Sequence, residues 1–161
     1  MGESDGFRVF AIASGKGGVG KTTTVVNLGA ALARVGFDVA IVDVDLGMAN
    51  LGAFVGLREP PATIHDVLAG SATLEEASYT KDRLTVVPGS TDLDSFARAN
   101  TEALASIVDE LRSTNDCVLL DVGAGLNHDI ALSISLADAV ILVTTADVSS
   151  LTDASKTGQL V

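Results

Sequence analysis

The sequence has 161 residues, a length that suits one domain with a substantial buried core. Hydrophobic residues make up 47% of it, glycine is frequent at 16 and aromatic residues are only 4%, which is typical of packed layers of aliphatic strands and helices. The 21 acidic against 10 basic side chains give a net charge of −11, which would repel nucleic acid and anionic lipid from most of the surface. The composition therefore favours an α/β protein and argues against a general polyanion binder.

Strand and helix signals alternate along the first third of the chain. Residues 8–13 predict a strand, a glycine-rich loop follows, and residues 21–35 repeat apolar side chains at helical spacing. Residues 37–42 predict a second strand that ends on Asp43 and Asp45. Several glycines and a pair of prolines favour irregular backbone over residues 46–62, which we interpret as a switch-like loop.

The same alternation continues to the end of the chain. We expect a short helix, a strand, a helix capped by Thr101, a buried strand, a helix and a strand, spanning residues 63–68, 84–87, 101–111, 118–121, 130–136 and 140–143. A final helix is expected to start near Ser149 or Ser150. These repeated units predict a mostly parallel sheet with helices on both faces. Residues 1–161 are expected to be a single domain that is incomplete at its C-terminus, because the last helix reaches Val161 without a cap signal.

The loop between the first strand and the first helix matches the phosphate-binding pattern G-x-x-x-x-G-K-[ST]. Its glycines permit positive φ, so successive N–H groups can face an anion at the positive end of the helix dipole. In this interpretation Lys21 reaches the β- and γ-phosphates and the Thr22 hydroxyl binds Mg²⁺. The predicted nucleotide contacts form one run: Gly15, Lys16, Gly17, Gly18, Val19, Gly20, Lys21, Thr22 and Thr23.

Carboxylates follow two of the predicted strands. Asp43 and Asp45 are two residues apart at a strand end, so we expect their side chains to point the same way, toward the ligand-binding edge of an α/β sheet. Residues 118–121 are an apolar strand ending in Asp121, the Walker B arrangement in which the aspartate holds Mg²⁺. Gly123 begins a glycine-containing segment able to move with the γ-phosphate. Thr22 and Asp121 are therefore the residues predicted to hold Mg²⁺.

Three motifs resemble those of the MinD/ParA superfamily of deviant-Walker P-loop ATPases. KGGVGKT carries Lys16 directly after its preceding glycine, D-x-D-x-G-x-x-N-L starts at Asp43, and D-V-G-A-G starts at Asp121. The resemblance is strongest for the MinD and FlhG branch and archaeal MinD-like proteins. It implies that Lys16 crosses a dimer interface to the partner's nucleotide and that Asp45 orients the attacking water. It implies catalytic roles for Lys16, Lys21 and Asp45, and nucleotide contacts by Asp43, Asn50 and Gly123.

The resemblance also implies a function. It implies a slow ATPase with ATP and Mg²⁺ as cofactors, which forms a homodimer with ATP and positions machinery for division, motility or polar structures. The implied partners are proteins of a positioning system and a membrane surface, reached through a C-terminal helix that is not in this chain. Direct nucleic-acid binding is not expected. The alternatives are a ParA-type DNA partition ATPase, for which a basic patch is expected, and a biosynthetic P-loop enzyme that forms amides.

Cellular location and habitat follow from other features. No apolar run approaches the roughly 18 residues of a membrane-spanning helix, and residues 1–6 do not resemble a secretory signal. We therefore expect a cytoplasmic protein that is peripheral if it meets the membrane. Lysine is rare, with only Lys16, Lys21, Lys81 and Lys156, and together with the acidic surplus this resembles a halophile's protein. His65 and His128 are interpreted as ordinary histidines without a catalytic role, and Cys117 as a buried, unreactive thiol.

Overall fold

The computed structural model describes residues 8–92, 100–125 and 128–160. Its strands and helices are β1 (Val9–Ser14), α1 (Lys21–Arg34), β2 (Val39–Asp43), α2 (Leu51–Phe54), α3 (Ile64–Leu68), β3 (Tyr79–Lys81), β4 (Leu84–Val87), α5 (Leu104–Thr114), β5 (Cys117–Ala124), α6 (His128–Ser135), β6 (Ala139–Leu142) and α7 (Val148–Thr157). Short 3₁₀ turns at Thr101–Ala103 and Gly158–Leu160 precede α5 and follow α7. Within these residues, no helix combines the length and the apolar character needed to cross a membrane.

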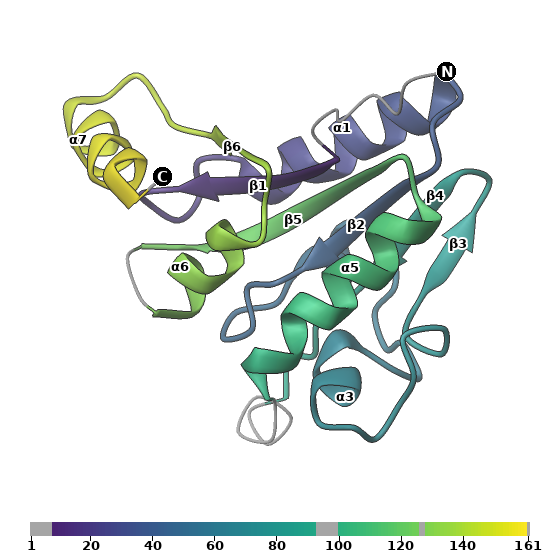
Figure 1. Cartoon of the computed structure of the whole chain (residues 1–161). Coiled ribbons are helices and arrows are strands. Elements are labelled where there is room, and N and C mark those ends of the chain that lie inside the picture. The colour runs from purple at the N-terminus through teal and green to yellow at the C-terminus, as the bar shows by residue number, and fades with distance from the viewer. Residues whose placement is uncertain (1–7, 93–99, 126–127, 161) are drawn as a thin grey trace.

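The strands form one sheet with the order β3-β4-β2-β5-β1-β6 (Figure 1). β5 lies between β1 and β2 and is parallel to both, while β6 is parallel to β1 and β4 to β2. The edge strand β3 is antiparallel to β4. The predicted α/β class with a mostly parallel sheet is confirmed.

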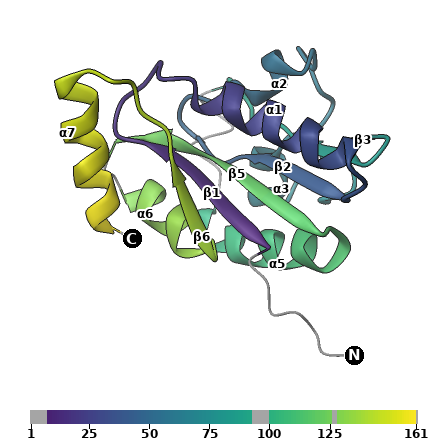
Figure 2. The same cartoon turned by 90° about the horizontal axis from the view of Figure 1, so that it is seen from above.

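Helices cover both faces of this sheet (Figure 2). α1 and α2 lie on one face, whereas α3, α5 and α6 lie on the other. Because side chains alternate along a strand, β2 packs Ile41 into the core under α1, and Ala40 and Val42 into the core on the opposite face. All of β2 is buried, which explains the nearly continuous apolar run in the sequence.

The structure differs from the prediction in three details. Thr101 is not the N-cap. That position belongs to Asn100, whose side-chain oxygen accepts the N–H of Glu102 over 3.2 Å. β5 extends through Gly123 and Ala124, so the start of the predicted second switch is strand rather than loop. The strand β3 was not predicted at all. It has only three residues and they are mostly exposed, so it carries no hydrophobic alternation.

The strand order places three functional segments together. The loop after β1, the loop after β2 and the end of β5 all lie at the carboxyl edge of neighbouring parallel strands. Ligands of open α/β sheets bind at this edge. The fold therefore brings the predicted P-loop and the predicted carboxylates into one region.

Candidate active site

The loop between β1 and α1 has the backbone of an anion-binding loop. Gly18 and Gly20 have φ of 79° and 96°, which residues with a side chain rarely adopt. Gly20 is also the N-cap of α1 and offers no side-chain cap, so N–H groups of the first turn remain for a ligand. A Cβ built on Gly17, Gly18 or Gly20 would meet no atom within 4 Å. This side of the loop is therefore open to an anion such as a phosphate.

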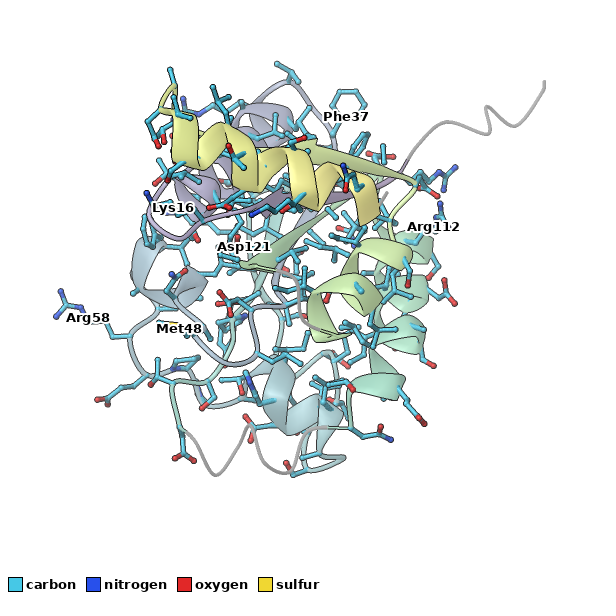
Figure 3. The ribbon with its side chains drawn as sticks, turned by 90° about the vertical axis from the view of Figure 1, so that its left-hand side faces the viewer. Lys16, Phe37, Met48, Arg58, Arg112 and Asp121 are labelled. Carbon is cyan, nitrogen blue, oxygen red and sulfur yellow. The ribbon has the colours of Figure 1, made fainter. Side chains whose placement is uncertain are left out.

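Gly15 has a different environment from the other glycines of the loop. A Cβ built on it would lie 2.3 Å from the carbonyl carbon of Asp153 and 2.6 Å from the nitrogen of Ala154. Both residues belong to α7, the helix that runs across the top of Figure 3 above Lys16. Gly15 was predicted to contact the nucleotide. The structure shows that it permits direct contact between the P-loop and the backbone of α7.

An ion pair links α1 to β5 at the base of the site. Nζ of Lys21 donates a hydrogen bond to Oδ1 of Asp121 over 2.6 Å, and the two side chains are 10% and 1% exposed. Oδ2 of Asp121 is also buried, and it has no hydrogen-bond partner among the described residues. A buried carboxylate oxygen is unfavourable unless a donor or cation satisfies it. Asp121 thus fits the predicted role of holding a metal ion or a metal-bound water.

A second contact joins α1 to the loop after β2. The Thr22 hydroxyl donates a hydrogen bond to Oδ1 of Asn50 over 3.0 Å. Asn50 is the residue before α2, so the contact connects the start of two helices. Hydroxyl and amide oxygens are hard ligands of the kind that Mg²⁺ accepts. The hydroxyl that is predicted to bind the metal ion is therefore held in place by a contact within the chain.

Asp43 organises the loop rather than lining the site. It is fully buried, and its carboxylate accepts the N–H groups of Asp45, Asn50 and Leu51 at 3.2, 2.9 and 2.9 Å. Burial raises the pKa of Asp43 from 3.8 to about 7. The hydrogen bonds from Leu51 and Asn50 oppose this rise, while the charges of Asp121 and Asp45 add to it.

Asp45 lies against the end of β5, with its carboxylate beside Gly123. β2 ends at Asp43, so the strand alternation from which the common direction of the two carboxylates was predicted does not extend to Asp45. A Cβ built on Gly123 would lie 3.1 Å from Oδ1 of Asp45, so a side chain there would crowd the carboxylate. Oδ1 also accepts the N–H of Met48 over 3.2 Å. A carboxylate on the cavity wall can accept a proton from a bound water.

Residues of the P-loop, the loop after β2 and the end of β5 surround a cavity of about 530 Å³. The predicted residues that line it are Gly17, Gly18, Gly20, Lys21, Thr22, Thr23, Asp45, Asn50 and Gly123. Those outside its described lining are Gly15, Lys16, Val19, Asp43 and Asp121. The lining residues that the sequence did not indicate are Ser14, Val44, Leu46, Gly47, Met48, Phe54, Ala124 and Ile130. Most of them lie inside or beside the motifs, so their positions in the sequence could have indicated that they line the cavity. Phe54 and Ile130 lie away from the motifs, and nothing in the sequence indicated them.

Lys16 lies at the surface, near the start of α7 (Figure 3). The pKa of Asp147, the N-cap of α7, is well below its ordinary value because Thr145 and Ser150 donate hydrogen bonds to it, and the charge of Lys16 contributes. Lys16 is exposed and lies outside the described lining of the cavity.

Metal-binding and histidine residues add further information. Across the described ranges, no group of three or more His, Cys, Asp and Glu side chains is placed to hold a metal ion. A Mg²⁺ ion here would need phosphate oxygens and water as well, which is its usual mode of binding. His65, which the sequence analysis set aside, is fully buried with both ring nitrogens hydrogen-bonded. The side chain of His128 lies outside the described residues. Cys117 is buried, and desolvation raises the pKa of its thiol.

Known proteins resemble this chain in sequence and in fold. A family model described as "AAA domain" matches residues 7–159. An uncharacterised ATP-binding protein of Methanocaldococcus jannaschii is 41% identical over 147 residues, which are 91% of this chain and 56% of that protein. The chain spans a little over half the length of the curated relatives it matches.

Two solved structures are similar over nearly the whole chain. The cell division ATPase MinD of Pyrococcus furiosus has a TM-score of 0.90 and 39% identity, and the match covers 96% of this chain and 66% of that one. The septum site-determining protein MinD of Pyrococcus horikoshii, complexed with Mg-ADP, has a TM-score of 0.89 and 39% identity, with coverage of 95% and 64%.

Proposed function

We propose that this chain, which belongs to the MinD/ParA superfamily of P-loop ATPases, is the nucleotide-binding part of an ATP-driven dimerisation switch that positions cellular machinery. The observation that carries the proposal is the convergence of the P-loop, the loop after β2 and the end of β5 on one cavity. Similar solved proteins are a cell division ATPase and a septum site-determining protein. Cell division is therefore the machinery that these relatives favour.

ATP and Mg²⁺ are the proposed ligands of the cavity. The N–H groups of the glycine loop and the ammonium of Lys21 would bind the phosphates. Thr22 would bind the metal ion, and the unsatisfied oxygen of Asp121 would accept from a metal-bound water. Bound Mg·ATP supplies the phosphoryl group and a cation that offsets the charge of its oxygens. The similar protein of Pyrococcus horikoshii is complexed with Mg-ADP, which supports this choice.

Hydrolysis is proposed to depend on Asp45. In phosphoryl transfer the protein mostly positions groups and stabilises charge. Asp45 stands on the cavity wall beside Gly123, where its carboxylate can orient a water and accept its proton. Lys21, at the start of α1 and in the cavity lining, would stabilise charge on the phosphate oxygens.

Dimerisation is proposed to depend on Lys16. Its side chain is exposed and outside the described lining of its own cavity. Lys16 is one of only four lysines in a chain of net charge −11, and this rarity supports a functional role for the cation at this position. We propose that Lys16 contacts the phosphates held by a second copy of the chain, which would couple ATP binding to dimer formation.

The proposed setting is the cytoplasm. The switch would bind protein partners of a positioning system in its ATP state and release them after hydrolysis. Membrane contact, where it occurs, would be peripheral. The acidic surplus, with its hydrated carboxylates, supports a halophilic origin as part of this proposal.

Size-exclusion chromatography with light scattering of the whole protein tests the switch. The sample is measured with ATP and with ADP, each in low and in multimolar salt. A dimer with ATP and a monomer with ADP is the expected result, and high salt is expected to favour the folded form. A monomer with both nucleotides would overturn the switch. ATP-dependent binding to DNA would favour a ParA-type DNA partition ATPase. Formation of ADP only in the presence of an amine and a carboxylate substrate would favour a biosynthetic enzyme that forms amides.

A further inference from the structure

We propose that His65 is a positioning residue that fixes the loop carrying Asp45, and this inference rests on the proposed ATPase function. His65 belongs to α3, which lies on the face of the sheet opposite α1. His65 does not line the described cavity and is not among the residues predicted to contact the nucleotide. Its role is therefore to act through the loop after β2, residues 44–50.

The ring of His65 joins two segments that are distant in sequence. Its side chain is fully buried. Nδ1 accepts the backbone N–H of Ser90 over 2.9 Å, and Nε2 lies 2.8 Å from the carbonyl oxygen of Leu46. Because an amide N–H can only donate and a carbonyl can only accept, Nδ1 is the bare nitrogen and Nε2 carries the proton. The two partners therefore fix the tautomer and the orientation of the ring.

The contact with Leu46 is made next to Asp45. Leu46 follows Asp45 directly, is itself buried and lines the cavity. The carboxylate of Asp43 fixes the two ends of the loop through the N–H groups of Asp45 and Asn50. His65 fixes the carbonyl between them. The position of Asp45 is thus set by contacts on both sides of it.

The segment before Ser90 also fits closely against this loop. A Cβ built on Gly89 would lie 2.4 Å from Cβ of Ala49 and 3.3 Å from Cγ of Asp43. The turn after β4 and the loop after β2 are therefore in direct contact, with His65 bonded to both. Movement of either segment would strain a hydrogen bond of the buried ring.

The helix that carries His65 is firmly held. Thr63 and Asp66 form a reciprocal capping box, with Asp66 Oδ2 accepting the N–H of Thr63 over 2.9 Å and its hydroxyl over 2.7 Å. The N–H of Ile64 donates to the carbonyl of Pro88 over 2.8 Å, and Ile64 is fully buried. α3 is therefore a fixed support from which the ring can restrain a loop.

Paired substitutions separate the two hydrogen bonds of the ring. In His65→Gln the side-chain amide reaches the position of Nε2 and can still donate to Leu46. In His65→Asn the shorter side chain has an oxygen near the position of Nδ1 and can accept from Ser90, but it does not reach Leu46. We expect His65→Gln to keep turnover within about 3-fold and His65→Asn to lose roughly 10-fold in kcat, with ATP affinity within a few-fold in both.

Amide hydrogen exchange of residues 44–50 gives a readout that needs no nucleotide. Exchange in this segment should be faster in His65→Asn than in the parent protein and in His65→Gln. Ile107→Val is the control, since Ile107 is a buried residue of α5 whose substitution lowers stability and which forms neither hydrogen bond of the ring. That control should leave kcat and the exchange of residues 44–50 unchanged.

The outcomes distinguish this inference from the proposed function. If the parent protein hydrolyses ATP and His65→Asn matches it in kcat and in loop exchange, the positioning role is wrong. If His65→Gln and His65→Asn are equally impaired, the ring acts only as a core residue, and the role is also wrong. If the parent protein does not hydrolyse ATP, the proposed function fails, while the exchange measurement still decides whether His65 fixes the loop.

Discussion

Nζ of Lys21 and Oδ1 of Asp121 are 2.6 Å apart, so the cation of the P-loop is paired with a carboxylate of the neighbouring strand. The ammonium has three N–H donors and Asp121 satisfies one of them. Phosphate oxygens could therefore engage the others without breaking the pair. The ion pair therefore fixes the position of the ammonium group at the base of the cavity.

Lys21→Ala is expected to abolish Mg·ATP binding. The substitution removes a phosphate contact that water cannot replace with the same geometry. It also leaves Asp121 buried without its cation, and breaking a buried pair in this way costs about 3–5 kcal/mol of stability. Isothermal calorimetry measures binding and denaturant unfolding measures stability. Lys81→Ala removes an exposed lysine of β3 and should change neither. Unchanged ATP affinity in Lys21→Ala would contradict the P-loop assignment.

Lys16→Ala is expected to leave nucleotide binding by the monomer nearly intact and to prevent the ATP-dependent dimer. Lys16 is exposed and outside the described cavity lining, so its loss should not affect phosphates held by its own chain. Light scattering with ATP measures the dimer fraction. Arg58→Ala, which removes an exposed cation pointing away from the body in Figure 3, serves as the control. A Lys16→Ala dimer with the parental turnover would rule out this role.

Asp45→Ala is expected to separate binding from turnover. ATP affinity should stay within a few-fold, while kcat falls roughly 10²-fold or more because the water is no longer aligned. The ATP-bound dimer should then accumulate, since the step that opens it is blocked. Asp121→Ala should instead weaken Mg²⁺ retention. ATP affinity, hydrolysis rate and dimer fraction measured on the same preparations distinguish the two variants, and normal hydrolysis by Asp45→Ala would shift the role to another residue.

The buried carboxyl of Asp43 predicts a pH dependence of stability. Its pKa is raised from 3.8 to about 7 in the folded protein, mainly by burial. Between these values the folded state holds a proton that the unfolded chain has released, so this contribution to the free energy of unfolding is complete below about pH 4 and is lost as the pH rises through about 7. The difference corresponds to roughly 4 kcal/mol at most.

Asp43→Asn isolates this contribution, because an amide does not titrate. Its free energy of unfolding, measured with denaturant at about pH 5 and about pH 8, should improve relative to the parent protein as the pH rises. Its amide group would face the N–H of Asp45, so a constant loss of stability is also expected. Asp82→Asn changes an exposed turn residue and is the control. A parallel pH response of Asp43→Asn and the parent protein would refute the raised pKa.

The elements with strong local patterns could be predicted from the sequence. β2 and β5 are buried on both faces, so their apolar runs were visible, and the spacing of apolar residues predicted α1 within one residue of its end. β3 could not be predicted, because a three-residue edge strand is defined by its pairing with β4 and not by its own side chains.

The site was predictable where a residue acts through its own motif. Lys21, Thr22 and Asp45 line the cavity as their motifs indicated. The tertiary contacts of His65 and Gly15 were not predicted: His65 bonds to Leu46 and Ser90, and Gly15 contacts α7. Contacts of this kind join segments far apart in the chain, so they depend on the tertiary structure and leave no local signal.

Close packing at Gly15 has a mechanical consequence. With no room for even a methyl group between the P-loop and the backbone of Asp153 and Ala154, helix and loop cannot slide independently. The outer side of α7 exposes Val148 and Leu151 to whatever meets the surface there. Because the backbone of α7 packs directly against Gly15, a shift of this helix would have to displace the first glycine of the phosphate-binding loop as well.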